Sequence, residues 1–293
     1  MMWVYTVTES DELQARRINS MKEIQSISKG AGWLWIDFMD PDDRESGIIA
    51  ELLKEIKVVK DIKEKRLFSQ AERVKEFMLL SIPHVVFKER LKRFPVYVLI
   101  KTGTLITIRS KHSSRLVRNS MKTFEDCVGK VCEEPINSSF ILSRFFHEIS
   151  NENLDAVMAL RESIDKIEQK ALANPGDRRI SHSVFAVKRE ASSLERIFWS
   201  QRELILSMRE GVVPMIETSE EIKTSLVHPI NNISRELTLL ESHNNALDSI
   251  LRLQDLGMIH RVERNLIYLT LIALFVSALL ILLEVDILSF MLR

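Results

Sequence analysis

Four oxygen-bearing side chains recur at intervals of seven residues near the end of the sequence. They are Glu263, Thr270, Ser277 and Glu284. Seven residues of α-helix fall only ~20° short of two full turns, so the four side chains share one face of a helix. If parallel copies of this helix surround a common axis, the stripe lines a water-filled path for cations. In the alternative interpretation, the hydroxyls bond back to their own backbone and the two glutamates mark the ends of a membrane segment.

The stripe runs along an uncharged segment, residues 266–283, with the sequence LIYLTLIALFVSALLILL. At ~1.5 Å per helical residue this segment is ~27 Å long, close to the ~30 Å hydrocarbon core of a bilayer. We therefore predict a transmembrane helix, and its C-terminal position argues against a signal or transit peptide. Arg261 and Arg264 precede the segment whereas only Arg293 follows it. The positive-inside rule thus predicts a cell-membrane protein with its N-terminal body in the cytoplasm and its C-terminus outside.

Composition argues against nucleic-acid binding and against catalysis. The chain has 41 basic and 41 acidic residues, so no global positive charge attracts nucleic acid. Cys127 and Cys132 are the only cysteines and have no second Cys/His pair nearby, which argues against a disulfide framework and a zinc site. The sequence contains neither a glycine-rich phosphate loop nor a nucleophile elbow. We expect neither an enzyme nor an organic cofactor.

Residues 1–112 are predicted to form an α/β cytosolic domain. Asp40 and Pro41 supply an N-cap and a first-turn proline for a helix that continues to about Lys57. The turn residues Thr102-Gly103-Thr104 join two strand candidates. These patterns predict a small sheet flanked by helices. The β-prone runs are residues 3–7, 33–36, 77–82, 96–101 and 105–109.

From residue 113 onward the sequence is predicted to be almost entirely helical, so the fold class is α+β. Residues 113–230 are assigned to a helical bundle. Within it, helices at 135–173 and 184–209 form a hairpin, because the turn-forming residues Asn174-Pro175-Gly176-Asp177 interrupt the helical pattern.

Residues 231–290 contain no proline and a single glycine, Gly257, so they can form one helix of ~90 Å. We divide this helix into a cytosolic stalk at 231–265 and a transmembrane helix at 266–290. One side of the stalk is apolar and is predicted to pack on the hairpin or on copies of itself. The apolar residues are Leu237, Leu240, Leu247, Ile250, Leu251 and Leu256.

Four short motifs occur in a characteristic order. Residues 33–41 contain Trp-Ile-Asp and a later proline, as in WIDL..P, and residues 105–108 match a strand written LITV. Residues 188–190 and 201–203 match KRE and QRE in the second hairpin helix, and residues 241–270 align without a gap. With these motifs the chain resembles the CorA family of magnesium transporters over almost its whole length.

The resemblance implies an N-terminal α/β domain, a helical hairpin and a stalk helix that becomes a membrane helix and lines the pore of a homopentamer. The implied activity is membrane transport of Mg²⁺, with Co²⁺ and Ni²⁺ as further candidate ions. The implied partners are the membrane and further copies of the chain. Pore-lining positions of the family correspond to Glu263, Leu269, Ser277 and Glu284, to which the seven-residue spacing adds Thr270. Rings of Glu263 and Glu284 would attract cations at the inner and outer mouths.

The resemblance also implies a regulatory divalent cation between neighbouring cytosolic domains. The N-domain aspartate of the family corresponds to Asp61, whereas its partner in the stalk corresponds to Asn245. Asp248, one turn further along the helix, is an oxygen ligand of the kind that a hard cation accepts. Alternatively, Asp61 and Asp248 are solvated surface acids.

The sequence also departs from the family, so two functions remain open. The Gly-Met-Asn signature falls at Ile287-Leu288-Ser289, the pore proline falls at Ala278, and we expect the second membrane helix and the acidic external loop to be missing. The first function is a homo-oligomeric channel or transporter for divalent metal cations. The second is a CorA-like membrane effector or sensor that is gated by a cytosolic ligand, for example a nucleotide signal, and does not transport magnesium.

Overall fold

The computed structural model describes residues 1–7, 13–28, 33–54, 68–87, 90–128 and 137–291, without the side chains of Val7, Leu13, 123–128 and 282–291. The chain divides into two compact units. Unit 1 comprises Met1–Arg161 and Glu190–Ser242, and unit 2 comprises Glu162–Arg189 and His243–Arg293.

Unit 1 is built on a seven-stranded mixed sheet. Strands β3 and β7 pair in parallel, and the other described neighbours pair antiparallel. The turn between β6 and β7 is closed by Thr102 and Gly103, and Gly103 has a φ of 72°, which glycine adopts without steric cost. From edge to edge the strands are β2 (Leu13–Ile18), β1 (Met2–Val7), β3 (Leu34–Met39), β7 (Thr104–Arg109), β6 (Leu91–Lys101), β5 (Phe77–Phe87) and β4 (Gln70–Val74).

All five predicted strands are present, but the sequence did not reveal β2 and β4. Both lie at the edges of the sheet and carry charged side chains, for example Arg16 in β2 and Glu72 in β4. Charges on edge strands hinder pairing with other proteins and also hide the strand pattern in the sequence. Strand β5 continues beyond the predicted end because Pro83 lies opposite Pro95 of β6, so neither residue has to donate a hydrogen bond to the other.

One face of the sheet packs against α1 (Met21–Ser28) and α2 (Asp43–Leu53). Ile36 and Phe38 of β3 share a core there with Ile49 of α2. The helix cap differs from the predicted one, because Asp42 rather than Asp40 is the N-cap. Asp42 and Glu45 form a reciprocal capping box that satisfies two backbone N–H groups. Asp40 instead has a φ of 43° and precedes this cap.

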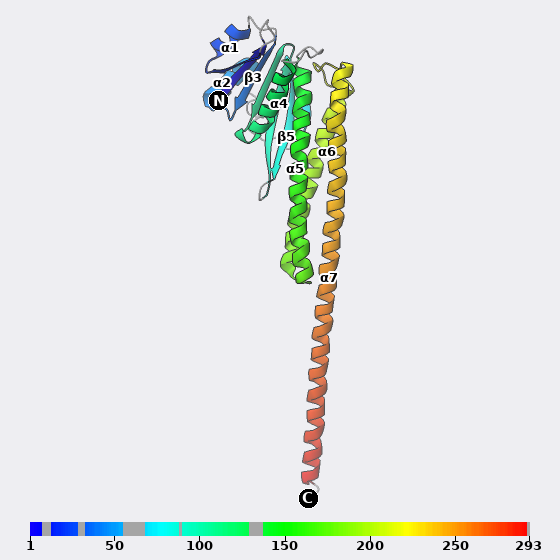
Figure 1. Cartoon of the computed structure of the whole chain (residues 1–293). Helices are drawn as coiled ribbons and strands as arrows, with labels where there is room; N and C mark the ends of the chain where they lie inside the picture. The colour runs from blue at the N-terminus through cyan, green and yellow to red at the C-terminus, as the bar shows by residue number, and fades with distance from the viewer. Residues whose placement is uncertain (8–12, 29–32, 55–67, 88–89, 129–136, 292–293) are drawn as a thin grey trace. The chain divides into compact units, whose positions relative to one another are not determined.

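The other face packs against helices that follow the sheet. A single 3₁₀ turn, η1 (Lys111–Ser113), leads into α4 (Ser114–Val128), and α5 (Ser138–Ala173) then begins. Figure 1 shows α4 and the start of α5 beside the strands. Trp35 of β3 meets Phe145 of α5 edge to face, with ring centroids 5.6 Å apart. Unit 1 therefore has helices on both faces of its sheet.

The helical hairpin and the long helix follow the predicted order. Helix α5 ends at Ala173 as predicted, but α6 (Arg178–Arg209) begins directly after the turn and six residues before its predicted start. Helix α7 (Glu220–Met291) begins eleven residues earlier than predicted and contains Pro229. An interior proline costs a helix ~3 kcal/mol, and burial of Leu226, Ile230 and Ile233 around it offsets this cost.

In unit 2, α7 packs against the tip of the hairpin through a face that includes a glycine. Gly257 lies so close to Pro175 that a Cβ atom on it would be 2.6 Å from the proline backbone. Gln254, one turn earlier, accepts a hydrogen bond of 2.7 Å from the Gly176 amide. The predicted apolar face is partly confirmed here, because Leu247 and Ile250 are buried whereas Leu256 is exposed.

Candidate pore helix and buried polar sites

The candidate pore residues lie on the last part of α7. This is the one described helix that is long and apolar enough to cross a membrane. Glu263, Leu269, Thr270 and Ser277 are exposed in the single chain, as are all described residues from His260 to Ile281. Glu284 lies within the helix, but its side chain is outside the described residues. An apolar segment that the described residues of its own chain leave unburied must be covered by lipid or by other helices.

Two of the stripe residues make local contacts. The hydroxyl of Thr270 donates to the carbonyl of Leu266 at 2.9 Å, which is the local bond expected in the alternative interpretation. Its oxygen keeps lone pairs for a second interaction, so this bond is also compatible with a polar path. Glu263 Oε2 lies 3.1 Å from His260 Nδ1 on the preceding turn.

Because α7 is uninterrupted, it fixes the angle between Thr270, which the seven-residue spacing predicted, and Leu269, which the family resemblance implied. Thr270 and Ser277 share the face of Glu263, whereas Leu269 lies one residue before Thr270 and hence ~100° round the helix. A path lined by both Leu269 and Thr270 requires a broad face of α7 rather than a narrow seam.

A chain of buried polar side chains connects three helices of unit 1 to the sheet. Gln201 of α6 donates to the carbonyl of Pro83 at 2.8 Å and accepts a hydrogen bond of 2.7 Å from Asn153 of α5. Glu236 of α7 lies beside Asn153 and is completely buried. The sequence contains a signal for Glu236 that we missed, because it lies three residues after Ile233 and four before Leu240, on the buried face.

Burial changes the chemistry of Glu236. Desolvation raises its pKa to about 8, although Asn153 and the charge of Arg235 act in the opposite direction. Within the part of the chain that the structure describes, neither carboxyl oxygen makes a well-formed hydrogen bond. A neutral carboxylic acid is the form that such a site tolerates best.

Of the two candidate regulatory carboxylates, only Asp248 lies within the described residues. Asp61 lies outside the described residues. Asp248 is paired with Lys188 of α6 at 2.5 Å, so a cation at this carboxylate would compete with an ammonium group. No three His, Cys, Asp or Glu side chains gather into a metal-binding group among the residues with described positions.

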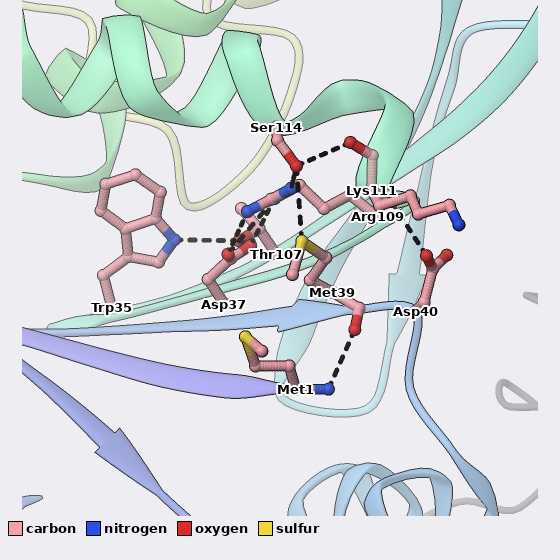
Figure 2. Close-up of polar contacts among 9 residues, drawn as sticks. All are labelled: Met1, Trp35, Asp37, Met39, Asp40, Thr107, Arg109, Lys111 and Ser114. Carbon is pink, nitrogen blue, oxygen red and sulfur yellow. Dashed lines mark hydrogen bonds and ion pairs between the residues drawn. The ribbon is translucent and has the colours of Figure 1, made fainter.

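The motif residues of β3 and β7 form a buried ion-pair network (Figure 2). Arg109 contacts both carboxylate oxygens of Asp37, with Nη2 2.8 Å from Oδ2 and Nε 3.0 Å from Oδ1. Thr107 donates to Asp37 at 2.7 Å and accepts from Trp35 Nε1 at 3.0 Å. Burial, and next the charge of Asp37, raise the pKa of Tyr5 to about 12. This network ties the two parallel strands together, so these residues have a structural role.

Comparison with known protein families matches residues 30–281 to the family described as CorA-like Mg²⁺ transporter protein. The chain belongs to that family. The match includes strands β3 to β7 of the sheet, the hairpin and α7 up to Ile281, which confirms the resemblance and the α+β fold of this CorA-like chain. It is a family of divalent cation transporters rather than enzymes, in agreement with the absence of catalytic motifs.

Solved structures share the fold of the CorA-like chain at low sequence identity. The complete CorA magnesium transporter from Methanocaldococcus jannaschii is 15% identical, with a TM-score of 0.70, over 91% of this chain and 80% of that one. Full-length CmaX is 12% identical, with a TM-score of 0.69, over 92% and 81%. The cytoplasmic domain of ZntB from Vibrio parahaemolyticus RIMD 2210633 is 12% identical, with a TM-score of 0.63, over 89% and 98%. Comparison with curated protein sequences gives no match.

Proposed function

We propose that this CorA-like chain forms a homo-oligomeric membrane channel or transporter for divalent cations, with α7 around the ion path. The observation that carries the proposal is that the family match continues through the exposed apolar part of α7 to Ile281. The transported ion is Mg²⁺ in the M. jannaschii relative, and Mg²⁺ is the first candidate here, followed by Co²⁺ and Ni²⁺. We further propose that the N-terminal body lies in the cytoplasm and that the C-terminus lies outside.

The polar stripe supports a path on one side of α7. Glu263, Thr270 and Ser277 occupy that side, and Glu284 continues it by helical spacing. A lone helix with such a stripe exposes polar atoms to lipid, whereas parallel copies turn them toward a shared axis. We propose Glu263, Leu269, Thr270, Ser277 and Glu284 as pore-lining residues.

The test is cation flux into liposomes that contain the purified chain, with Mg²⁺, Co²⁺ or Ni²⁺ outside and a metal-sensitive dye inside. Glu284→Gln removes one negative charge per copy from the proposed outer mouth and should lower the flux at least several-fold. Glu284→Lys should nearly abolish flux. The matched control is Asp286→Asn, because two residues of helix place this position ~200° away from the stripe.

Two results would contradict the assignment in different ways. A flux that depends on Asp286 but not on Glu284 would show that the stripe faces lipid or another helix. Equal flux in protein-free liposomes would show that the chain transports none of these ions. If the chain transports none of these ions but still forms oligomers, the second function applies. The chain would then act as a membrane effector or sensor gated by a cytosolic ligand.

We also propose that Asp61 and Asp248 bind a regulatory divalent cation between protomers. Millimolar Mg²⁺ should then raise the melting temperature of the cytosolic part and slow its proteolysis, since a ligand that binds the folded state stabilises it. Asp61→Ala should remove this protection, and Asp248→Asn should weaken it. Equal protection in wild type and Asp61→Ala would identify Asp61 as a solvated surface acid.

A further inference from the structure

A basic pocket of about 560 Å³ opens at the tip of the hairpin in unit 2. The turn between α5 and α6, the first residues of α6 and one face of α7 line it. Three of its lining residues are arginines, Arg178, Arg179 and Arg261, against one acid, Asp177. The apolar side chains of Met258 and Val262 complete the wall on α7.

The acid in this pocket is already paired. Arg179 Nη2 lies 3.1 Å from Asp177 Oδ2, and hydrogen bonds from Arg179 hold the pKa of Asp177 below its usual range. Asp177 therefore offsets Arg179, and the charges of Arg178 and Arg261 remain in excess. Arg261 donates one N–H group to the carbonyl of Pro175 at 3.2 Å, which fixes its guanidinium at the pocket. The N-terminus of α6 adds positive partial charge at the same place.

The pocket lies at the level of α7 where the membrane segment begins. Val262 precedes Leu266, the first residue of the uncharged run, by four residues, or ~6 Å along a helix. The polar headgroup layer on each side of a bilayer is ~5–8 Å thick. If the hydrocarbon core begins at Leu266, the pocket opens in the layer that contains lipid phosphates.

We propose that this pocket binds the phosphate group of an anionic phospholipid, with Arg178 and Arg261 as its phosphate-binding side chains. Arginine suits this role because its planar guanidinium donates two parallel hydrogen bonds to phosphate oxygens. Val262, one residue nearer the membrane segment than Arg261, gives the glycerol and acyl part an apolar surface. The proposal requires α7 to enter the membrane near Leu266, and it does not depend on ion conduction.

The experiment measures lipid binding to the purified full-length chain in a neutral detergent by native mass spectrometry. Phosphatidylglycerol and phosphatidylcholine are titrated separately, because both contain phosphate but only the first has a net negative charge. The double variant Arg178→Gln/Arg261→Gln should bind phosphatidylglycerol at least about tenfold more weakly than wild type. Arg252→Gln is the control, since Arg252 is exposed on the same helix nine residues earlier and hence ~180° round from Arg261.

A competition experiment distinguishes a lipid ligand from a free phosphate ion. Inorganic phosphate at millimolar concentration should not displace phosphatidylglycerol, whereas complete displacement would assign the pocket to a soluble phosphate compound and overturn the lipid proposal. Equal binding of the two lipids, or wild-type affinity in the double variant, would also overturn it. If the double variant is unstable by melting, Arg178→Gln alone provides the test, because Arg178 is an exposed side chain.

Discussion

Glu236 couples the charge of one carboxyl group to the folding of the three long helices of unit 1. Its pKa is about 8 in the folded chain and close to 4.5 in a solvated one. Below the lower value both states carry the proton, and the site has no pH-dependent penalty. Between the two values the unfolded chain releases the proton while the folded chain keeps it, so stability falls as pH rises through this window. Above about pH 8 the penalty of a buried carboxylate is complete.

Glu236→Gln should remove this pH dependence, because the amide has nearly the same shape and no charge. At pH 9 the variant should be more stable than wild type by on the order of 3 kcal/mol, and at pH 5 the two should be nearly equal. The measurement is chemical denaturation of the detergent-solubilised chain across pH 5–9. A constant difference at every pH would show that packing rather than ionisation distinguishes the two side chains.

At the scale of elements, Gly257 sets how closely α7 approaches the turn of the hairpin. Gly257→Ala would place its methyl group 2.6 Å from Pro175 and 2.7 Å from the Gly176 nitrogen, so the helix or the turn must move. We expect a loss of ~1–3 kcal/mol in denaturation experiments. Gly47→Ala is the control within α2, where an added Cβ would have no described atom within 4 Å apart from its chain neighbours and the nearby helix backbone, and it should raise stability by ~0.5–1 kcal/mol. A stabilising effect of both changes would contradict the close approach at Gly257.

Element order could be predicted from the sequence because each central strand and each long helix has its own local pattern. The edge strands β2 and β4 were missed, since their charged residues suit exposure rather than a core. The early start of α7 was missed because local rules place Pro229 outside a helix, whereas packing of Leu226 and Ile230 keeps it inside.

The candidate sites also differ in whether a local sequence pattern can predict them. The stripe on α7 follows from spacing alone, because every member lies on one helix. The chain from Glu236 through Asn153 to Gln201 brings together side chains from three helices, and the basic pocket joins Arg178 to Arg261. Such groupings depend on tertiary contacts, which no local pattern in one sequence contains.

At the scale of the whole molecule, the exposed apolar part of α7 requires parallel copies or a lipid surface around it. We expect a pentamer in mild detergent, with a protein mass of about five times 34.0 kDa by light scattering with detergent correction. Hydroxyls and carboxylates on one side favour an assembly in which that side is turned inward. A monomer in several mild detergents would contradict both the assembly and the ion path, whereas another oligomer number would revise only the stoichiometry.

The contact between Gly257 and the hairpin turn fixes the rotation and the axial position of α7 at that point. The direction and depth of every later residue on the helix are counted from it. Because the helix continues without interruption, each residue added after Gly257 advances the membrane segment by ~1.5 Å and turns it by ~100°. One inserted residue therefore turns the stripe away from the shared axis and toward a neighbouring copy of the helix. Seven inserted residues restore its direction but displace the apolar run by ~10 Å along the helix axis. Insertions and deletions between Gly257 and Glu263 are thus constrained in both angle and depth, independently of which side chains occupy the positions between them.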